Sequence, residues 1–158
     1  MSLVLARIDD RLIHGQVVVG WVRQTQANCI VVANDAVAAD PMQRTLLPMA
    51  VPHNIEVAIY RVREAAEKLG AGAHAARRVI LLFASPMDAL DFVKGGGELP
   101  ELNVGGIRFG PGKEQLRKSV SLGPEEREAL AELRRGGIDV FVQMVPGEPR
   151  EPLSAILD

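Results

Sequence analysis

The stretch Leu3–Gln16, LVLARIDDRLIHGQ, decides the fold class because it joins three kinds of segment in a fixed order. An apolar run typical of a strand comes first, a charged loop follows, and a segment with helical spacing of apolar residues begins at the end. We predict a strand over Leu3–Ile8 and a helix over Gln16–Gln26. A strand, a short loop and a helix are the repeating unit of an α/β domain.

The same alternation continues to the end of the chain. Further strands are predicted over Cys29–Ala33, Asn54–Tyr60, Arg78–Ala84, Leu102–Val104, Ser119–Leu122 and Ile138–Val142. Further helices are predicted over Ala36–Ala50, Val62–Leu69, Met87–Lys94, Pro124–Arg135 and Leu153–Leu157. We therefore expect residues 1–158 to form a single doubly wound α/β domain, with a mostly parallel sheet and helices on both faces.

The charge and the apolar runs restrict the partners and the location. The chain has 18 basic and 20 acidic side chains, a net charge of −2 and a pI of about 5.9, a balance that argues against nucleic acid or an anionic membrane surface as the ligand. The longest apolar runs, such as Val79–Ala84, are far shorter than the roughly 20 residues of a membrane span. With no signal-peptide pattern, we expect a cytoplasmic protein, and if it works on membrane transport it must do so from the aqueous side.

Several common chemistries lack their sequence signatures. The chain has no GxGxxG after the first strand, no Walker-type loop and no GxSxG elbow, which disfavours a nucleotide-binding or phosphatase-like enzyme. Cys29 is the only cysteine and is best explained as a small buried apolar residue. The three histidines show no metal-ligand spacing. We expect no metal and no cofactor, and we interpret His53 and His74 as structural or surface residues.

The charged loop after the first strand is the leading candidate site, because ligands of open α/β sheets collect at the carboxyl ends of the strands. Arg7 and Arg11 supply two guanidinium forks for phosphate oxygens, and Asp9 or Asp10 could accept a hydrogen bond from the imidazole of His14. Such a loop favours a phosphoryl group carried on the histidine. A surface cluster of ion pairs, of little value to stability, would give the same pattern.

Two backbone features would assist an anion at this loop. The first amides of the predicted helix, those of Gly15 and Gln16, would point at a group held beside His14. A glycine-rich segment over residues 105–113, which contains Arg108 and Lys113, either folds over an anionic site or forms a wide connection between short strands. The residues alone leave both interpretations of this segment open.

The motif RIDDRLIHGQV, with Trp21 soon after it, resembles the N-terminal signature of the IIB subunits of the mannose/fructose/sorbose class of the bacterial phosphoenolpyruvate-dependent sugar phosphotransferase system. The similarity continues through segments spread over nearly the whole chain. These segments read VVAND at 31–35, TLL at 45–47, NVGG at 103–106 and QMVP at 143–146.

The resemblance implies a specific activity. His14 would be transiently phosphorylated, taking the phosphoryl group from a phosphohistidine on a IIA domain and giving it to a sugar that enters through the membrane subunits IIC and IID. Arg7 and Arg11 would stabilise the group in transit, and Asp9 or Asp10 would orient the loop. No metal or nucleotide takes part in the reaction of the family.

The resemblance also implies an arrangement in the cell. We expect a free-standing cytoplasmic IIB subunit, held at the inner face of the membrane through its partners, and we leave a homo-oligomer open. The alternative interpretation is a regulatory binding module that is phosphorylated in the same way but is not coupled to sugar transport.

Overall fold

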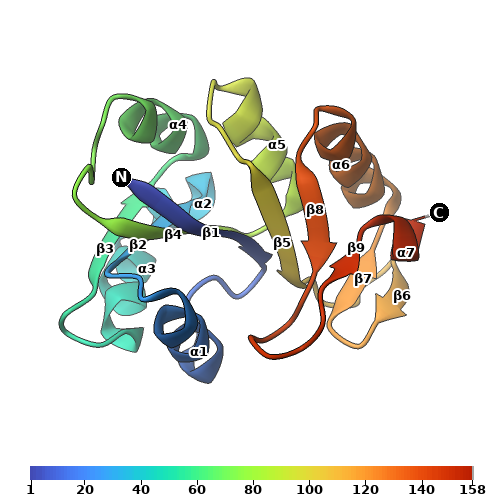
Figure 1. Cartoon of the computed structure of the whole chain (residues 1–158), viewed down its shortest axis with the longest axis horizontal. Helices are drawn as coiled ribbons and strands as arrows, with labels where there is room; N and C mark the ends of the chain where they lie inside the picture. Colours follow the sequence, from blue (N-terminus) through green and yellow to red (C-terminus); the bar gives the residue numbers. More distant parts are fainter. Residues whose placement is uncertain (158) are drawn as a thin grey trace.

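The computed structural model describes residues 1–157 and builds them around a seven-stranded sheet with the order β3-β2-β4-β1-β5-β8-β9 (Figure 1). The six parallel strands are β1 (Ser2–Asp9), β2 (Cys29–Ala33), β3 (Glu56–Tyr60), β4 (Arg78–Phe83), β5 (Glu101–Gly106) and β8 (Asp139–Val142). The short edge strand β9 (Glu151–Pro152) runs antiparallel to β8. The predicted mostly parallel sheet is confirmed.

Helices cover both faces of this sheet. They are α1 (Gly15–Thr25), α2 (Asp35–Ala38), α3 (Pro41–Leu46), the 3₁₀ helix η1 (Leu47–Ala50), α4 (Val62–Gly70), α5 (Pro86–Lys94), α6 (Pro124–Arg135) and α7 (Ser154–Leu157). Figure 1 shows α4, α5 and α6 along one side of the sheet and α1 and α3 along the other. The predicted doubly wound architecture is therefore confirmed.

Alternation of side chains along the strands makes two separate cores. Val31, Leu81 and Phe83 point to one face, where Phe83 meets Phe92 of α5 edge to face at 5.4 Å between ring centroids. Ile30 and Leu82 are examples of the residues that point to the other face, in the same cluster as Trp21 of α1. Strands buried on both sides explain the continuous apolar runs of the sequence.

The strand order places the charged loop at a reversal of the sheet. The connection after β1 leads to β2 on one side of β1, and the connection after β4 leads to β5 on the other side. Ligand sites of doubly wound sheets lie at such a reversal, outside the carboxyl ends of the strands. The segment that follows Asp9 occupies this position.

The prediction of one helix over Ala36–Ala50 is wrong, because capping residues divide the segment into α2, α3 and η1. Asn34 caps α2 through a hydrogen bond from the amide of Val37. The side chain of Asp40 accepts hydrogen bonds from the amides of Met42 and Gln43 and starts α3. Polar side chains that bind nearby amides in this way compete with a continuous helix.

Two further departures lie near the end of the chain. The predicted strand Ser119–Leu122 is present as β7 (Val120–Leu122), but it pairs with β6 (Glu114–Arg117) in a separate antiparallel hairpin. The predicted strand Leu102–Val104 extends to Gly106, and this brings the glycine pair next to β1. Among residues 1–157, no helix has the length and apolar character required to cross a membrane.

Candidate functional site

A tight turn leads from β1 to His14. The amide of Leu12 donates to the carbonyl oxygen of Asp9 at 2.9 Å, and Leu12 adopts a left-handed conformation with φ of 57°. The side chains of Leu12 and Ile13 are buried and anchor the turn in the core next to Trp21. His14 follows in extended conformation as the N-cap residue of α1, so its ring stands at the amino end of that helix.

Asp9 is the centre of the site, and its side chain is 1% exposed. Oδ2 lies 2.8 Å from Nε2 of His14 and 3.1 Å from Nη2 of Arg7. Oδ1 accepts a hydrogen bond of 3.1 Å from the backbone amide of Arg11. A carboxylate can only accept, so Nε2 of His14 carries the hydrogen and Nδ1 presents the lone pair.

Arg7 supports Asp9 from inside the protein. Its Nη1 donates to Oδ1 of Asn103 at 2.6 Å and to the carbonyl oxygen of Gln143 at 3.1 Å, and its guanidinium lies 5.5 Å from the ring centroid of Trp21. Burial lowers the pKa of Arg7, an effect that the neighbouring Asp9 partly offsets. The sequence predicts that Arg7 holds phosphate oxygens, whereas in the fold its guanidinium faces the interior.

Arg11 has the opposite placement from Arg7. Its side chain is 46% exposed, and its Nε lies 3.7 Å from Oδ1 of Asp9. The imidazole of His14 is itself 20% exposed and can meet another protein. A long cationic side chain at the surface beside an accessible ring can approach an anion on that ring at little cost.

Asp10 belongs to a different set of contacts. Its Oδ2 accepts from the backbone amide of Arg108 at 2.8 Å and from Nε of Arg108 at 3.2 Å, and its own amide donates to the carbonyl oxygen of Gly106. Oδ1 of Asp10 is buried without a hydrogen-bond partner among residues 1–157. Asp10 thus connects the glycine-rich segment to the charged loop, whereas Asp9 is the aspartate whose side chain contacts His14.

The glycine-rich segment contributes to a cavity next to the charged loop. A cavity of about 290 Å³ lies beside the loop, lined by residues that include Asp10, Arg11 and Arg108. Nζ of Lys113 lies 3.0 Å from Oε2 of Glu126 on α6 and donates to the carbonyl oxygen of Arg108 at 3.4 Å. The structure therefore brings Arg108 near the loop through Asp10, while Lys113 forms an ion pair with the helix.

The first turn of α1 supplies backbone donors at the same place. Gly15, at φ of 35°, and Gln16 are the first two residues of the helix after His14. The amides at the start of a helix have no acceptor within the helix, and they stand at the positive end of its dipole. A group bound to the ring of His14 would lie near these amides.

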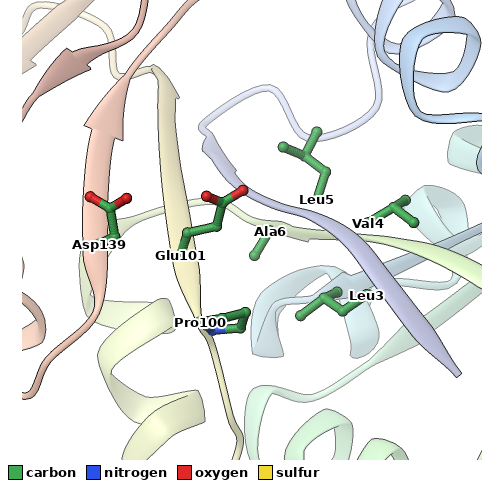
Figure 2. Close-up of a pocket in the computed structure, with 7 residues that line it drawn as sticks. All are labelled: Leu3, Val4, Leu5, Ala6, Pro100, Glu101 and Asp139. Carbon is green, nitrogen blue, oxygen red and sulfur yellow. The ribbon is translucent and has the colours of Figure 1, made fainter.

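Figure 2 shows a second cavity, at the amino-terminal ends of the parallel strands. It has a volume of about 180 Å³ and lies where β1 and β5 separate, because their pairing begins only at Arg7 and Asn103. The carboxylates of Glu101 and Asp139 line it from neighbouring strands. Glu101 is paired with Nη1 of Arg150 at 2.9 Å. This cavity is formed by the amino-terminal ends of the strands, whereas His14 follows the carboxyl end of β1.

Sequence reasoning singled out four residues that the fold brings together, namely Arg7, Asp9, Arg11 and His14. It missed Asn103 and Gln143, which hold Arg7 in place. A polar Asn103 inside an otherwise apolar run was the available signal for one of them. The carbonyl oxygen of Gln143 has no sequence signal, since any residue at that position offers one.

The sequence and the fold match known proteins along nearly the whole chain. Residues 3–158 match the family described as PTS system sorbose subfamily IIB component. The chain is therefore a component of a sugar phosphotransferase system. More specifically, it belongs to the sorbose subfamily of IIB components, as the sequence resemblance predicts.

Individual relatives agree with this membership. The chain is 38% identical over 156 residues to the N-acetylgalactosamine-specific phosphotransferase enzyme IIB component 2 of Escherichia coli (strain K12), covering 99% of each chain. It is 38% identical over 150 residues to the mannose-specific EIIAB component of the same organism, covering 95% of this chain and 46% of that one. The crystal structure of the IIBSor domain of the sorbose permease from Klebsiella pneumoniae superposes with a TM-score of 0.91 at 37% identity, covering 97% of this chain and 94% of that one.

Proposed function

We propose that His14 accepts a phosphoryl group from a phosphohistidine of a IIA domain and passes it to a sugar delivered by IIC and IID membrane subunits. Membership of the sorbose subfamily of IIB components supports a role in sugar phosphotransfer. The observation that carries the assignment to His14 is the 2.8 Å contact between its Nε2 and the buried carboxylate of Asp9. This contact fixes the ring and its tautomer beside the amino end of α1.

The same contact selects the nitrogen that reacts. Asp9 engages Nε2, so Nδ1 attacks the phosphorus atom as its lone pair forms the new P–N bond. The P–N bond to the donor histidine breaks at the same time, and the electron pair returns to the donor ring. In the second transfer a sugar hydroxyl oxygen forms the P–O bond and its proton passes to solvent. The P–N bond breaks, its electron pair stays on Nδ1, and His14 leaves as the neutral ring.

The surrounding charges stabilise the group that is carried. Arg11 is the accessible guanidinium, and it would bind phosphoryl oxygens together with the amides of Gly15 and Gln16. Hydrogen bonds to a charged group contribute about 1.5–3 kcal/mol each, and a helix dipole adds about 0.3–1 kcal/mol. Arg7 acts through Asp9 as a positioning residue. Because both reacting groups are histidines, alignment and charge stabilisation dominate the catalysis.

The partners follow from the reaction. A 38% identical relative carries the name EIIAB, which supports a IIA domain as the phosphoryl donor for this chain. Delivery to a sugar requires the membrane subunits, so the protein would work in the cytoplasm at the inner face of the membrane. The exposed edge of His14 and the side chain of Arg11 would lie in the contact with each partner in turn.

The experiment is phosphoryl transfer from labelled phosphoenolpyruvate through the upstream carriers and a IIA protein. The wild-type chain is expected to acquire an acid-labile, base-stable label, and His14→Ala is expected to lose it while it keeps the wild-type circular dichroism. His53→Ala, an exposed histidine outside the site, is the matched control and is expected to label normally. Labelling of His14→Ala would overturn the assignment, and phosphorus NMR of the labelled protein would show whether Nδ1 carries the group.

A second stage separates a transport role from a regulatory one. Membranes that contain the cognate IIC and IID subunits, with the labelled protein added, are expected to release sugar phosphate. A label that stays on His14 in these membranes would instead identify a regulatory binding module that is phosphorylated but not coupled to transport.

A further inference from the structure

Three side chains with metal-binding atoms meet at the end of the sheet where the parallel strands begin, and His14 lies at the other end of these strands. Cys29 is the first residue of β2, Glu56 is the first residue of β3, and His74 lies in the loop between α4 and β4. Cys29 and Glu56 are register partners on adjacent parallel strands, so their side chains point to the same face. The thiol sulfur, a carboxylate oxygen and a ring nitrogen all lie within 4.8 Å of one another.

Hydrogen bonds and ion pairs to neighbouring residues position the side chains of Glu56 and His74. Nδ1 of His74 faces Oε1 of Glu56 at 3.3 Å, while Nε2 lies 2.9 Å from the hydroxyl oxygen of Tyr60. The other carboxylate oxygen, Oε2 of Glu56, is paired with Nε of Arg77 at 3.1 Å. Nδ1 of His74 and Oε1 of Glu56 thus point toward each other beside Cys29. The second polar atom of each of these two side chains is held by Tyr60 and Arg77, respectively.

We propose that Sγ of Cys29, Oε1 of Glu56 and Nδ1 of His74 form a binding site for Zn²⁺, with water as the fourth ligand. The mixed sulfur, nitrogen and oxygen set matches the preference of zinc, whereas magnesium and calcium take oxygen ligands. Bonds of about 2.0–2.3 Å in a tetrahedron place the ligand atoms roughly 3.5 Å apart, so atoms that lie within 4.8 Å of one another must close by at most about 1.3 Å.

The side chains on the two sides of the set can make that closure. Glu56 is 39% exposed and reaches the site from the solvent side, and His74 is carried on a loop. With the metal on Nδ1, Nε2 carries a hydrogen and donates it to the hydroxyl oxygen of Tyr60. A second-shell acceptor of this kind fixes the ring orientation of zinc-bound histidines.

Binding requires the loss of one proton. Burial, with a smaller contribution from Glu56, raises the pKa of the Cys29 thiol to about 11. The free protein at neutral pH therefore holds a thiol, and formation of the Zn–S bond breaks the S–H bond and releases its proton to solvent. The charged and titratable groups that face the sulfur are Glu56, His74, Tyr60 and Arg77. The expected release is one proton for each zinc bound.

This site is independent of the phosphotransfer chemistry. Cys29 and Glu56 stand at the amino ends of their strands, whereas His14 follows the carboxyl end of a parallel strand of the same sheet. A cation here would join β2, β3 and the loop before β4. We expect zinc to raise the melting temperature of the protein and to leave the labelling rate of His14 unchanged.

The test uses the untagged full chain after removal of metal, titrated first with Co²⁺ alone. The expected result is a near-ultraviolet thiolate-to-cobalt band that saturates at one equivalent and disappears when Zn²⁺ is added. Cys29→Ala is expected to lose the band, and His74→Asn, which suits the left-handed backbone at φ of 61°, is expected to weaken binding at least tenfold. His14→Ala and His53→Ala are the controls and are expected to keep the band.

Two further measurements prevent an ambiguous result. If Cys29→Ala does not fold, Glu56→Gln replaces it, because Glu56 is partly exposed, and it is expected to keep the band with affinity reduced at least tenfold. Calorimetry in two buffers of different ionisation enthalpy is expected to show the release of one proton. Absence of the thiolate band in the wild type, its persistence in Cys29→Ala, or its loss in His14→Ala would each overturn the proposal.

Discussion

Gly105 gives the sharpest test of how the site is held together. A Cβ atom built on Gly105 would lie closer than 3.0 Å to Cζ and to both terminal nitrogens of Arg7. The guanidinium of Arg7 is buried and bonded to Asp9, Asn103 and Gln143, so Gly105→Ala must displace a paired internal charge. Breaking a buried ion pair costs about 3–5 kcal/mol. The free energy of unfolding is typically about 5–15 kcal/mol, so we expect a folded but strongly weakened protein.

Two neighbouring glycines provide a graded comparison for Gly105→Ala. A Cβ on Gly106 would lie 3.2 Å from Oδ1 of Asp9, so Gly106→Ala is expected to cost about 1 kcal/mol. A Cβ on Gly110 would meet no atom within 4 Å, so Gly110→Ala is expected to change the free energy of unfolding by less than about 1 kcal/mol.

Urea unfolding measures the series directly. With a slope of about 2 kcal/mol per molar, the midpoint for Gly105→Ala is expected to fall by roughly 2 M relative to the wild type. The rate of His14 labelling is expected to fall as well, because Arg7 holds the carboxylate of Asp9. A midpoint for Gly105→Ala that equals that of Gly110→Ala would refute the reasoning about Arg7.

Three other predictions concern single side chains. Asp9→Asn is expected to slow the labelling of His14 by about two orders of magnitude, because an amide favours the wrong imidazole tautomer. The control Asp10→Asn is expected to stay near the wild-type rate. Equal rates for the two variants would contradict the assignment of Asp9. Arg11→Ala is expected to slow the labelling of His14 about tenfold. The urea midpoint is expected to stay unchanged, since the side chain of Arg11 is 46% exposed. A large loss of stability would show that Arg11 is structural. Burial raises the pKa of Asp88, so its contribution to stability is full below an unfolded pKa of about 3.9 and is lost as the pH rises through the folded value. Thermal melts of wild type and Asp88→Asn from about pH 3 to about pH 7 should therefore show the variant gaining relative stability as the pH rises, and a constant difference would contradict this.

The fold was predictable where hydrophobic pattern and length agree. Residues 79–83 of β4 and Cys29–Ala33 of β2 are buried on both faces and form continuous apolar runs, so the two strands were predicted to within one residue of their bounds. β6 reads EQLR and β9 has only two residues, and neither carries an apolar period of its own. Such strands form because a neighbouring segment offers backbone partners, and this depends on the tertiary structure.

The sequence predicts which residues form the site better than it predicts the role of each residue. Residues two apart on a strand share a face, so the spacing of Arg7 and Asp9 places both on the same face as Leu5. The residues alone left Asp9 and Asp10 open as the partner of His14, and the 2.8 Å contact in the structure distinguishes them. The placement of Asn103 and Gln143 next to Arg7 depends on the order β1-β5-β8, which no local pattern encodes.

The buried position of Arg7 has a consequence for a phosphorylated His14. A phosphoryl group carries up to two negative charges, and the carboxylate of Asp9 lies 2.8 Å from the same ring. A group on Nδ1 would stand across the ring from this carboxylate, and two like charges roughly 6.5 Å apart repel by about 2.5 kcal/mol at an effective dielectric constant of 20. Arg7, 3.1 Å from Asp9 on the interior side, offsets this repulsion while it leaves the outer side of the ring free. Arg11 and the first amides of α1 then remain available to the arriving group. Under the proposed function, the interior arginine would neutralise Asp9 and the surface arginine would bind the phosphoryl group, so neither could replace the other.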